Sequence, residues 1–169
     1  PKKRTRLTNL RMRRVDLVDA GDNPGAEILL AKAHRSVDWL ASSPDMIKLI
    51  TQGNAGNQLM TAVGCLFQGA RLYGSDPLAM AARSSLQTVM SRVYRDDGVV
   101  MEKGGLDASY FTVSLEVMVN MIRTMSDTDR EAFRPLLLKS VNKFLSLISR
   151  DGTIDMSGNT RTETTHFVA

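Results

Sequence analysis

Two carboxylates, Glu102 and Asp107, are the residues of this sequence that best fit acid–base chemistry. Paired carboxylates at a suitable separation can serve as general acid and general base. Here they flank the pair Gly104 and Gly105, and glycines allow so many backbone conformations that the spacing selects no hydrolytic geometry. We favour the structural alternative, in which Asp107 caps a helix and Glu102 is a loop acid.

The remaining reactive residue types indicate no catalytic or metal centre. Cys65 is the only cysteine and has apolar neighbours on an expected helix, so we interpret it as a buried thiol without a disulfide partner in the chain. The two histidines, His34 and His166, lie far from it in sequence and have no acidic cluster at metal-ligand spacing. No phosphate-binding glycine motif follows a strand. We therefore predict no catalytic residue, no metal and no cofactor.

Positive charge is concentrated at the N-terminus. The first 14 residues contain no acid and seven basic side chains, which are Lys2, Lys3, Arg4, Arg6, Arg11, Arg13 and Arg14. The rest of the chain has 15 basic and 18 acidic residues, although the whole carries +4. A block of like charge at a terminus is typical of an arm that binds nucleic acid or an acidic protein surface. The alternative is a solvated terminus, since the block has no aromatic residue for base stacking.

No segment resembles a signal peptide, and no run of 18 apolar residues occurs, so we predict neither secretion nor a membrane span. We interpret Pro1 as the residue left after removal of an initiator methionine. The expected site of synthesis is therefore the cytoplasm.

Residues 15–32 have the pattern of a β-hairpin or extended docking segment. Val15, Leu17 and Val18 indicate a first strand and residues 28–30 a second, while the Asn23-Pro24-Gly25 sequence favours a type II turn between them. Two strands alone are marginal in water. We therefore expect the hairpin to lie on the helical body or on another molecule.

The same segment resembles a known family. Behind its basic lead-in, it carries the pattern V-D-L-V-D-x-G-x-N-P-G-A-x-I-x-L-x-K, from Val15 to Lys32. This pattern is similar to the opening segment of tailed-phage head-morphogenesis and minor-capsid proteins, over about 20 residues that include no catalytic one. The resemblance implies a virion or assembly role. Its partners would be capsid or other virion subunits, or packaged DNA contacted by the basic arm.

Helical patterns occupy residues 34–149. The most apolar one, residues 107–125, predicts a central helix surrounded by others, with Asp107 or Ser109 as its cap. Further helices are expected at about 57–73, ending at Gly74, and from Asp76 to Tyr94. Two short pieces should meet at the sequence Ser42-Ser43-Pro44. Pro135 should divide the last helix into a piece ending at residue 134 and another over 136–148.

Two loops echo one another at a spacing of 54 residues. The sequence SRVYRDDGVVM (91–101) compares with SLISRDGTIDM (146–156), and each follows a helix, which indicates a repeated helix pair. Residues 91–162 are also similar to the inter-helix loops of α/α-toroid proteins related to polysaccharide-processing enzymes. That likeness implies a sugar site with Glu102 and Asp107 as paired carboxylates, Tyr110 as proton donor or stacking surface, and Asn159 and Arg161 as polar partners. A complete toroid has ten or more helices, so one copy of this chain cannot close it.

The sequence thus predicts a mainly α protein, either an antiparallel bundle or a partial α/α-toroid of five to six helices, with an N-terminal β-arm. The expected parts are a basic arm (1–14), a docking hairpin (15–32), a helical domain (34–149) and a polar tail (150–169). We predict a structural virion protein, present in multiple copies on a particle, that attaches through Val15, Leu17, Asn23, Pro24 and the seven basic residues of the arm. A carbohydrate-binding or carbohydrate-active helical module is the alternative.

Overall fold

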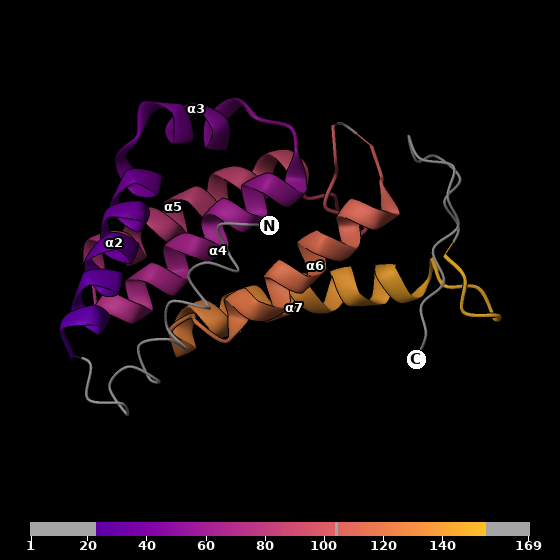
Figure 1. The fold of residues 1–169 in the computed structure, drawn as a ribbon. Coiled ribbons are helices and arrows are strands. Elements are labelled where there is room, and N and C mark those ends of the chain that lie inside the picture. Colours follow the sequence, from indigo (N-terminus) through magenta and orange to yellow (C-terminus); the bar gives the residue numbers. More distant parts are fainter. Residues whose placement is uncertain (1–22, 104, 155–169) are drawn as a thin grey trace.

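The computed structural model describes residues 23–103 and 105–154, and within these ranges the protein is mainly helical, with six helices and no strand (Figure 1). α2 and the C-terminal end of α7 lie at opposite sides of the bundle. The helices are α2 (Asn23–Ser42), α3 (Pro44–Gln52), α4 (Gly56–Tyr73), α5 (Asp76–Val93), α6 (Ala108–Ile122) and α7 (Asp127–Leu145).

The centre of the bundle is α4, which packs against α2, α5 and α6. Eleven of its 18 residues are buried, whereas α6 buries six of 15. The expectation that residues 107–125 form the central helix is therefore wrong. The physical reason is the small residues of α4, which let its neighbours approach closely: a Cβ built on Gly64 would lie 3.0 Å from Val117 of α6, and one on Gly69 would collide with Val37 of α2.

α2 replaces the second half of the expected hairpin. Residues 23–25 were expected to form a turn and 28–30 a strand, and both expectations are wrong, because residues 23–42 are one helix. Ala33, Val37 and Leu40 are buried and lie on one helical face, so packing against α4 favours the helix over the strand. Pro24 is tolerated because the first helical turn has no intrahelical partner for its N–H groups. The expected first strand, at residues 15–18, lies outside the described residues.

Local signals placed most other helix ends correctly. α3 begins at Pro44 after Ser43, and α4 ends at Gly74, whose φ of 60° is left-handed, as predicted. The cap of α5 is Ser75, whose hydroxyl accepts a 3.4 Å hydrogen bond from the N–H of Leu78. Asp76, the expected cap, is instead the first helical residue.

α7 is one helix, so the predicted division at Pro135 is wrong. Proline removes the bond to the carbonyl four residues earlier, at Glu131. Both Pro135 and Glu131 are exposed, so that carbonyl lies on the water-facing side of the helix. A single lost bond on that side does not end the helix.

The 54-residue echo is confirmed in the backbone. An isolated bridge pairs Tyr94 with Val100, and another pairs Ile148 with Ile154. The inner bonds correspond as well: the N–H of Arg95 donates to the carbonyl of Val99 (2.9 Å), as that of Ser149 does to Thr153 (2.7 Å).

Each loop also turns at a left-handed glycine, Gly98 with φ 94° and Gly152 with φ 81°. One residue before it, an aspartate, Asp97 or Asp151, accepts a bond through Oδ1 from the backbone N–H two residues ahead. The two helix–loop units, α5 with 94–100 and α7 with 148–154, are therefore structural repeats.

The first loop docks on α7. The hydroxyl of Tyr94 donates to the carbonyl of Leu136 (2.8 Å), and that of Ser140 donates to the carbonyl of Gly98 (2.7 Å). Lys143 lies 3.5 Å from the carboxylate of Asp97. These contacts hold the second repeat against the first.

Candidate functional site

The two carboxylates expected to form an acid–base pair each bind a helix N-terminus instead. Glu102 lies beside Ala55 in a β-bridge, and its carboxylate accepts a 3.3 Å bond from the N–H of Asn57 in the first turn of α4. Asp107 is buried, and its Oδ1 accepts a 3.2 Å bond from the N–H of Tyr110 in the first turn of α6. Helix N-termini favour such acids. The structural interpretation of both residues is therefore the one that the geometry supports.

The other residues of the expected sugar site are divided. Tyr110 is half-buried and faces a groove described below, whereas Asn159 and Arg161 lie outside the described residues. The structure thus brings Tyr110 close to Asn57, the residue whose N–H binds Glu102, and shows no paired carboxylates on a common ligand.

Most of the expected attachment residues also lie outside the described part of the chain, namely Lys2, Lys3, Arg4, Arg6, Arg11, Arg13, Arg14, Val15 and Leu17. Asn23 and Pro24 are described, and they belong to the first turn of α2 rather than to a loop.

A surface that the sequence did not reveal runs along α2 and α3. Ile28, Trp39 and Ile47 are large apolar side chains with 57%, 44% and 49% of their surface exposed. Ile28, Lys32, Arg35 and Trp39 follow one another at spacings of four, three and four, which places them on one helical face. We call the exposed residues Ile28, Lys32, Arg35, Trp39, Ile47 and Lys48 the α2–α3 face. Because residues 28–30 read as a strand in sequence, this helical stripe was missed.

An apolar groove lies over α4, between α2 and α3 on one side and α6 on the other. Its volume is about 520 Å³. We call it the α4 groove, and it is lined by Leu40, Met46, Leu49, Asn57, Gln58, Thr61, Ala62, Cys65, Tyr110 and Val113. Cys65 lies in its wall, which agrees with the predicted buried thiol.

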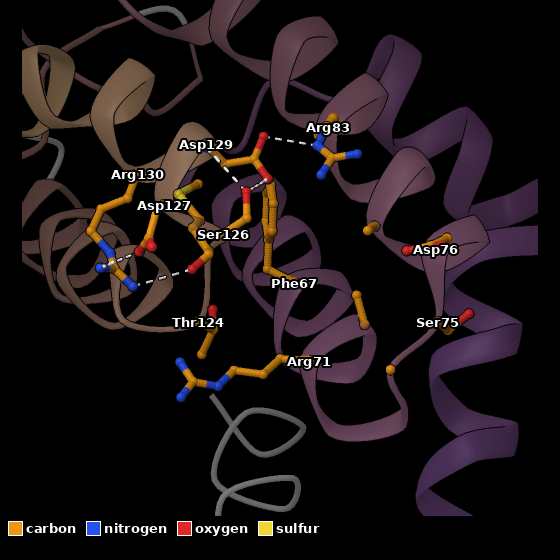
Figure 2. Close-up of a pocket in the computed structure, with 14 residues that line it drawn as sticks. Phe67, Arg71, Ser75, Asp76, Arg83, Thr124, Ser126, Asp127, Asp129 and Arg130 are labelled. Atoms are coloured by element: carbon orange, nitrogen blue, oxygen red, sulfur yellow. Dashed lines mark hydrogen bonds and ion pairs between the residues drawn. The ribbon is translucent and has the colours of Figure 1, made fainter.

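A second pocket, of about 480 Å³, has a different character (Figure 2). It forms where the end of α4, the start of α5 and the turn between α6 and α7 meet, and we call it the ionic pocket. Arg83 of α5 donates to Asp129 at 2.8 Å, and Arg130 donates to Asp127 at 2.9 Å. Figure 2 shows Arg83 and Arg130 approaching the start of α7 from opposite sides.

The arginines of the ionic pocket also bind backbone carbonyls. Arg130 donates to the carbonyls of Ile122 (3.2 Å) and Met125 (3.3 Å), and Arg71 donates to that of Arg123. These carbonyls belong to the end of α6 and the turn after it, where helix termini leave acceptors without intrahelical partners. The arrangement closes the α6–α7 turn rather than presenting arginines to a ligand.

The ionic pocket shifts two pKa values. The hydrogen bond from Arg83 lowers the pKa of the Asp129 carboxyl, and the bond from the hydroxyl of Ser126 adds to this against the opposing effect of burial. The same contact raises the pKa of the Arg83 guanidinium. Both groups are therefore charged at neutral pH. Sequence reasoning placed Asp129 in the first turn of α7 but missed Arg83, because 46 residues separate them.

Among the described residues, no three His, Cys, Asp or Glu side chains are grouped so that they could hold a metal ion. None of the helices in this part of the chain combines the length and hydropathy needed to cross a bilayer.

Comparison with protein-family models, with curated proteins and with solved structures gave no significant match.

Proposed function

We propose that this chain is a structural, non-catalytic component of a tailed-phage particle, a decoration or minor head protein attached through its N-terminal segment. The observation that carries the proposal is the α2–α3 face, on which exposed apolar side chains alternate with Lys32, Arg35 and Lys48. Tryptophan and arginine are enriched among the residues that dominate binding energy at protein interfaces. The face begins only a few residues after the strongly basic segment 1–14.

The basic segment and the α2–α3 face would act together on an acidic, partly apolar surface of a particle subunit. Charge complementarity speeds the encounter and sets the orientation, while the apolar anchors lengthen the lifetime of the complex. Many copies on a symmetric shell would allow a modest affinity at each site. The resemblance of residues 13–32 to phage head proteins supports the same assignment.

Co-sedimentation with purified particles tests the proposal. A chain that begins at Asp22 keeps all of α2, and we expect it to fold with the helical circular dichroism of the full chain but to leave the particle fraction. In the full-length chain, the double variant Trp39→Ala and Arg35→Glu should weaken binding at least about tenfold, the effect of losing one interface hot spot.

Matched controls lie elsewhere on the surface. Met80, on α5, is 67% exposed, and Arg134, on α7, is exposed as well. The double variant Met80→Ala and Arg134→Glu removes an apolar side chain and reverses a positive charge in the same way. It should bind as the full chain does. Undiminished binding of the chain that begins at Asp22, or equal losses in both double variants, would exclude attachment through this region.

A carbohydrate-binding module is the second candidate, and the matched loops at 54-residue spacing favour it, because repeated helical hairpins are what the α/α-toroid likeness implies. A glycan-binding and lyase screen of the full chain, beside Glu102→Gln and Asp107→Asn, tests it. A sugar signal that both variants lose while their melting temperatures stay close to that of the unsubstituted protein would support a sugar site. A screen without signal would remove this candidate.

A further inference from the structure

The α4 groove has an uncharged lining. Six of its residues are apolar or sulfur-containing aliphatic side chains, and the polar ones are Asn57, Gln58, Thr61 and Tyr110. Small-molecule sites in proteins have volumes of about 300–1,000 Å³ and combine a mainly apolar wall with a few polar groups. At about 520 Å³ the groove fits this description. An ionised ligand would lose its hydration there without gaining an opposite charge.

Polarity changes along the groove. Asn57, Gln58 and Thr61 lie in the first turns of α4, and Ala62 and Cys65 follow toward its middle. From residue 57 to residue 65 a helix rises about 12 Å. Thr61 donates its hydroxyl proton to the carbonyl of Asn57 (2.7 Å), so the hydroxyl oxygen keeps its lone pairs for a donor in the groove. The groove therefore has a hydrogen-bonding end and an apolar end.

The walls of the groove are tied to the rest of the protein. Arg92 of α5 donates to the carbonyls of Ile50 (2.8 Å) and Gly53 (2.6 Å), which fixes the end of α3 beside Leu49. The hydroxyl of Tyr73 donates to the carbonyl of Leu30 (3.1 Å), which ties α2 to α4. A groove held open in this way binds a ligand without first paying the entropy of ordering its walls.

We propose that the α4 groove is a binding site for a small, uncharged, mainly apolar molecule with one hydrogen-bonding end. The polar end of the ligand lies at Asn57, Gln58 and Thr61, and its apolar body lies along Ala62, Cys65, Met46 and Val113. This site is separate from the α2–α3 face and does not depend on attachment to a particle.

Two fluorescent probes that differ by one charge test the site in the full-length protein. N-phenyl-1-naphthylamine is uncharged, and 8-anilino-1-naphthalenesulfonate has the same ring system with a sulfonate. We expect saturable binding of one uncharged probe per chain, with the sulfonate bound at least about tenfold more weakly because the groove offers it no cation. Absence of saturable binding, or equal affinity for both probes, would overturn the proposal.

A pair of threonine variants locates the probe. Thr61 and Thr88 are both half-buried on helices, and each hydroxyl donates to the carbonyl four residues earlier, at 2.7 Å and 3.0 Å. Only Thr61 lines the groove. Thr61→Phe should fill it and lower the affinity at least tenfold, whereas Thr88→Phe should leave the affinity unchanged. Equal effects of the two substitutions would contradict binding in the groove.

Cys65 gives a second readout that needs no substitution, because it is the only cysteine of the chain. Bound probe should slow alkylation of Cys65 by N-ethylmaleimide several-fold, measured by mass spectrometry of the intact protein. An unchanged alkylation rate at saturating probe would place the probe elsewhere and overturn the assignment, even if Thr61→Phe failed to fold. Sedimentation showing that the chain dimerises, and that Thr61→Phe abolishes the dimer, would assign the groove to a second copy instead.

Discussion

Asp107 shows how a residue that could do chemistry is used by the backbone. Its carboxylate is 5% exposed and accepts the N–H of Tyr110, and the matching acid Glu102 accepts the N–H of Asn57. Removing an N-cap acid costs about 1 kcal/mol of helix stability. Loss of activity in an Asp107 variant would therefore carry no catalytic meaning without a measurement of folding stability.

Ser140 provides a prediction at the same scale. It is fully buried, and its hydroxyl donates to the carbonyl of Gly98 at 2.7 Å. Ser140→Ala should lower the free energy of unfolding by about 1–3 kcal/mol, because a buried carbonyl loses its partner. Ser146→Ala removes an exposed hydroxyl that donates to its own helix at Lys143, and it should have no measurable effect in urea denaturation. Equal effects would show that the bond to Gly98 does not hold the loop.

Asp129 gives a pH-dependent prediction. Because its pKa is lowered in the folded state, the pair with Arg83 stabilises the protein above the pKa of the unfolded carboxyl, and this contribution is lost as the pH falls through the folded value. At neutral pH, Asp129→Asn should be less stable than the unsubstituted protein by about 1 kcal/mol or less, since solvent screens the pair. The difference should disappear in acid, as followed by thermal unfolding between pH 7 and pH 2. A difference that stays constant would point to packing rather than charge.

At the scale of elements, two left-handed glycines differ in their surroundings. A Cβ on Gly98 would lie 2.6 Å from the carbonyl oxygen of Lys139, whereas nothing lies within 4 Å of one on Gly74. Gly74→Ala should therefore cost only the left-handed backbone strain of about 1–2 kcal/mol. Gly98→Ala should cost more and separate the loop from α7, as measured by chemical denaturation and amide exchange. Equal costs would mean that the close contact at Gly98 relaxes freely.

The repeated loops make a prediction about the whole molecule. The first loop docks on α7 through Leu136, Ser140 and Lys143, and the second has the same internal bonds. In a chain with residues 101–154 duplicated in tandem, the second loop would meet a copy of that α7 surface. We expect one cooperative unfolding transition and undiminished helical content per residue. Two separate transitions in calorimetry would show that the repeats do not stack.

Charge is distributed differently in the whole molecule from what the N-terminal count alone indicated. Residues 23–154 contain 14 basic and 13 acidic side chains, so the helical body is close to neutral. Its basic character is local, on the α2–α3 face, beside apolar side chains. A neutral body with one mixed apolar and basic face favours binding in a single orientation over general adhesion to polyanions.

Local chemistry in the sequence determined the ends of α3, α4 and α6 and the echo of the two loops, because a cap or a left-handed glycine acts on residues within one turn. Contacts between distant residues decided the rest. α2 is helical because Ala33, Val37 and Leu40 pack on α4, and α7 stays whole at Pro135 because the lost bond lies on the water-facing side. The pairing of Arg83 with Asp129 and the uncharged α4 groove arise only when the folded helices bring separate segments together, which no local pattern encodes.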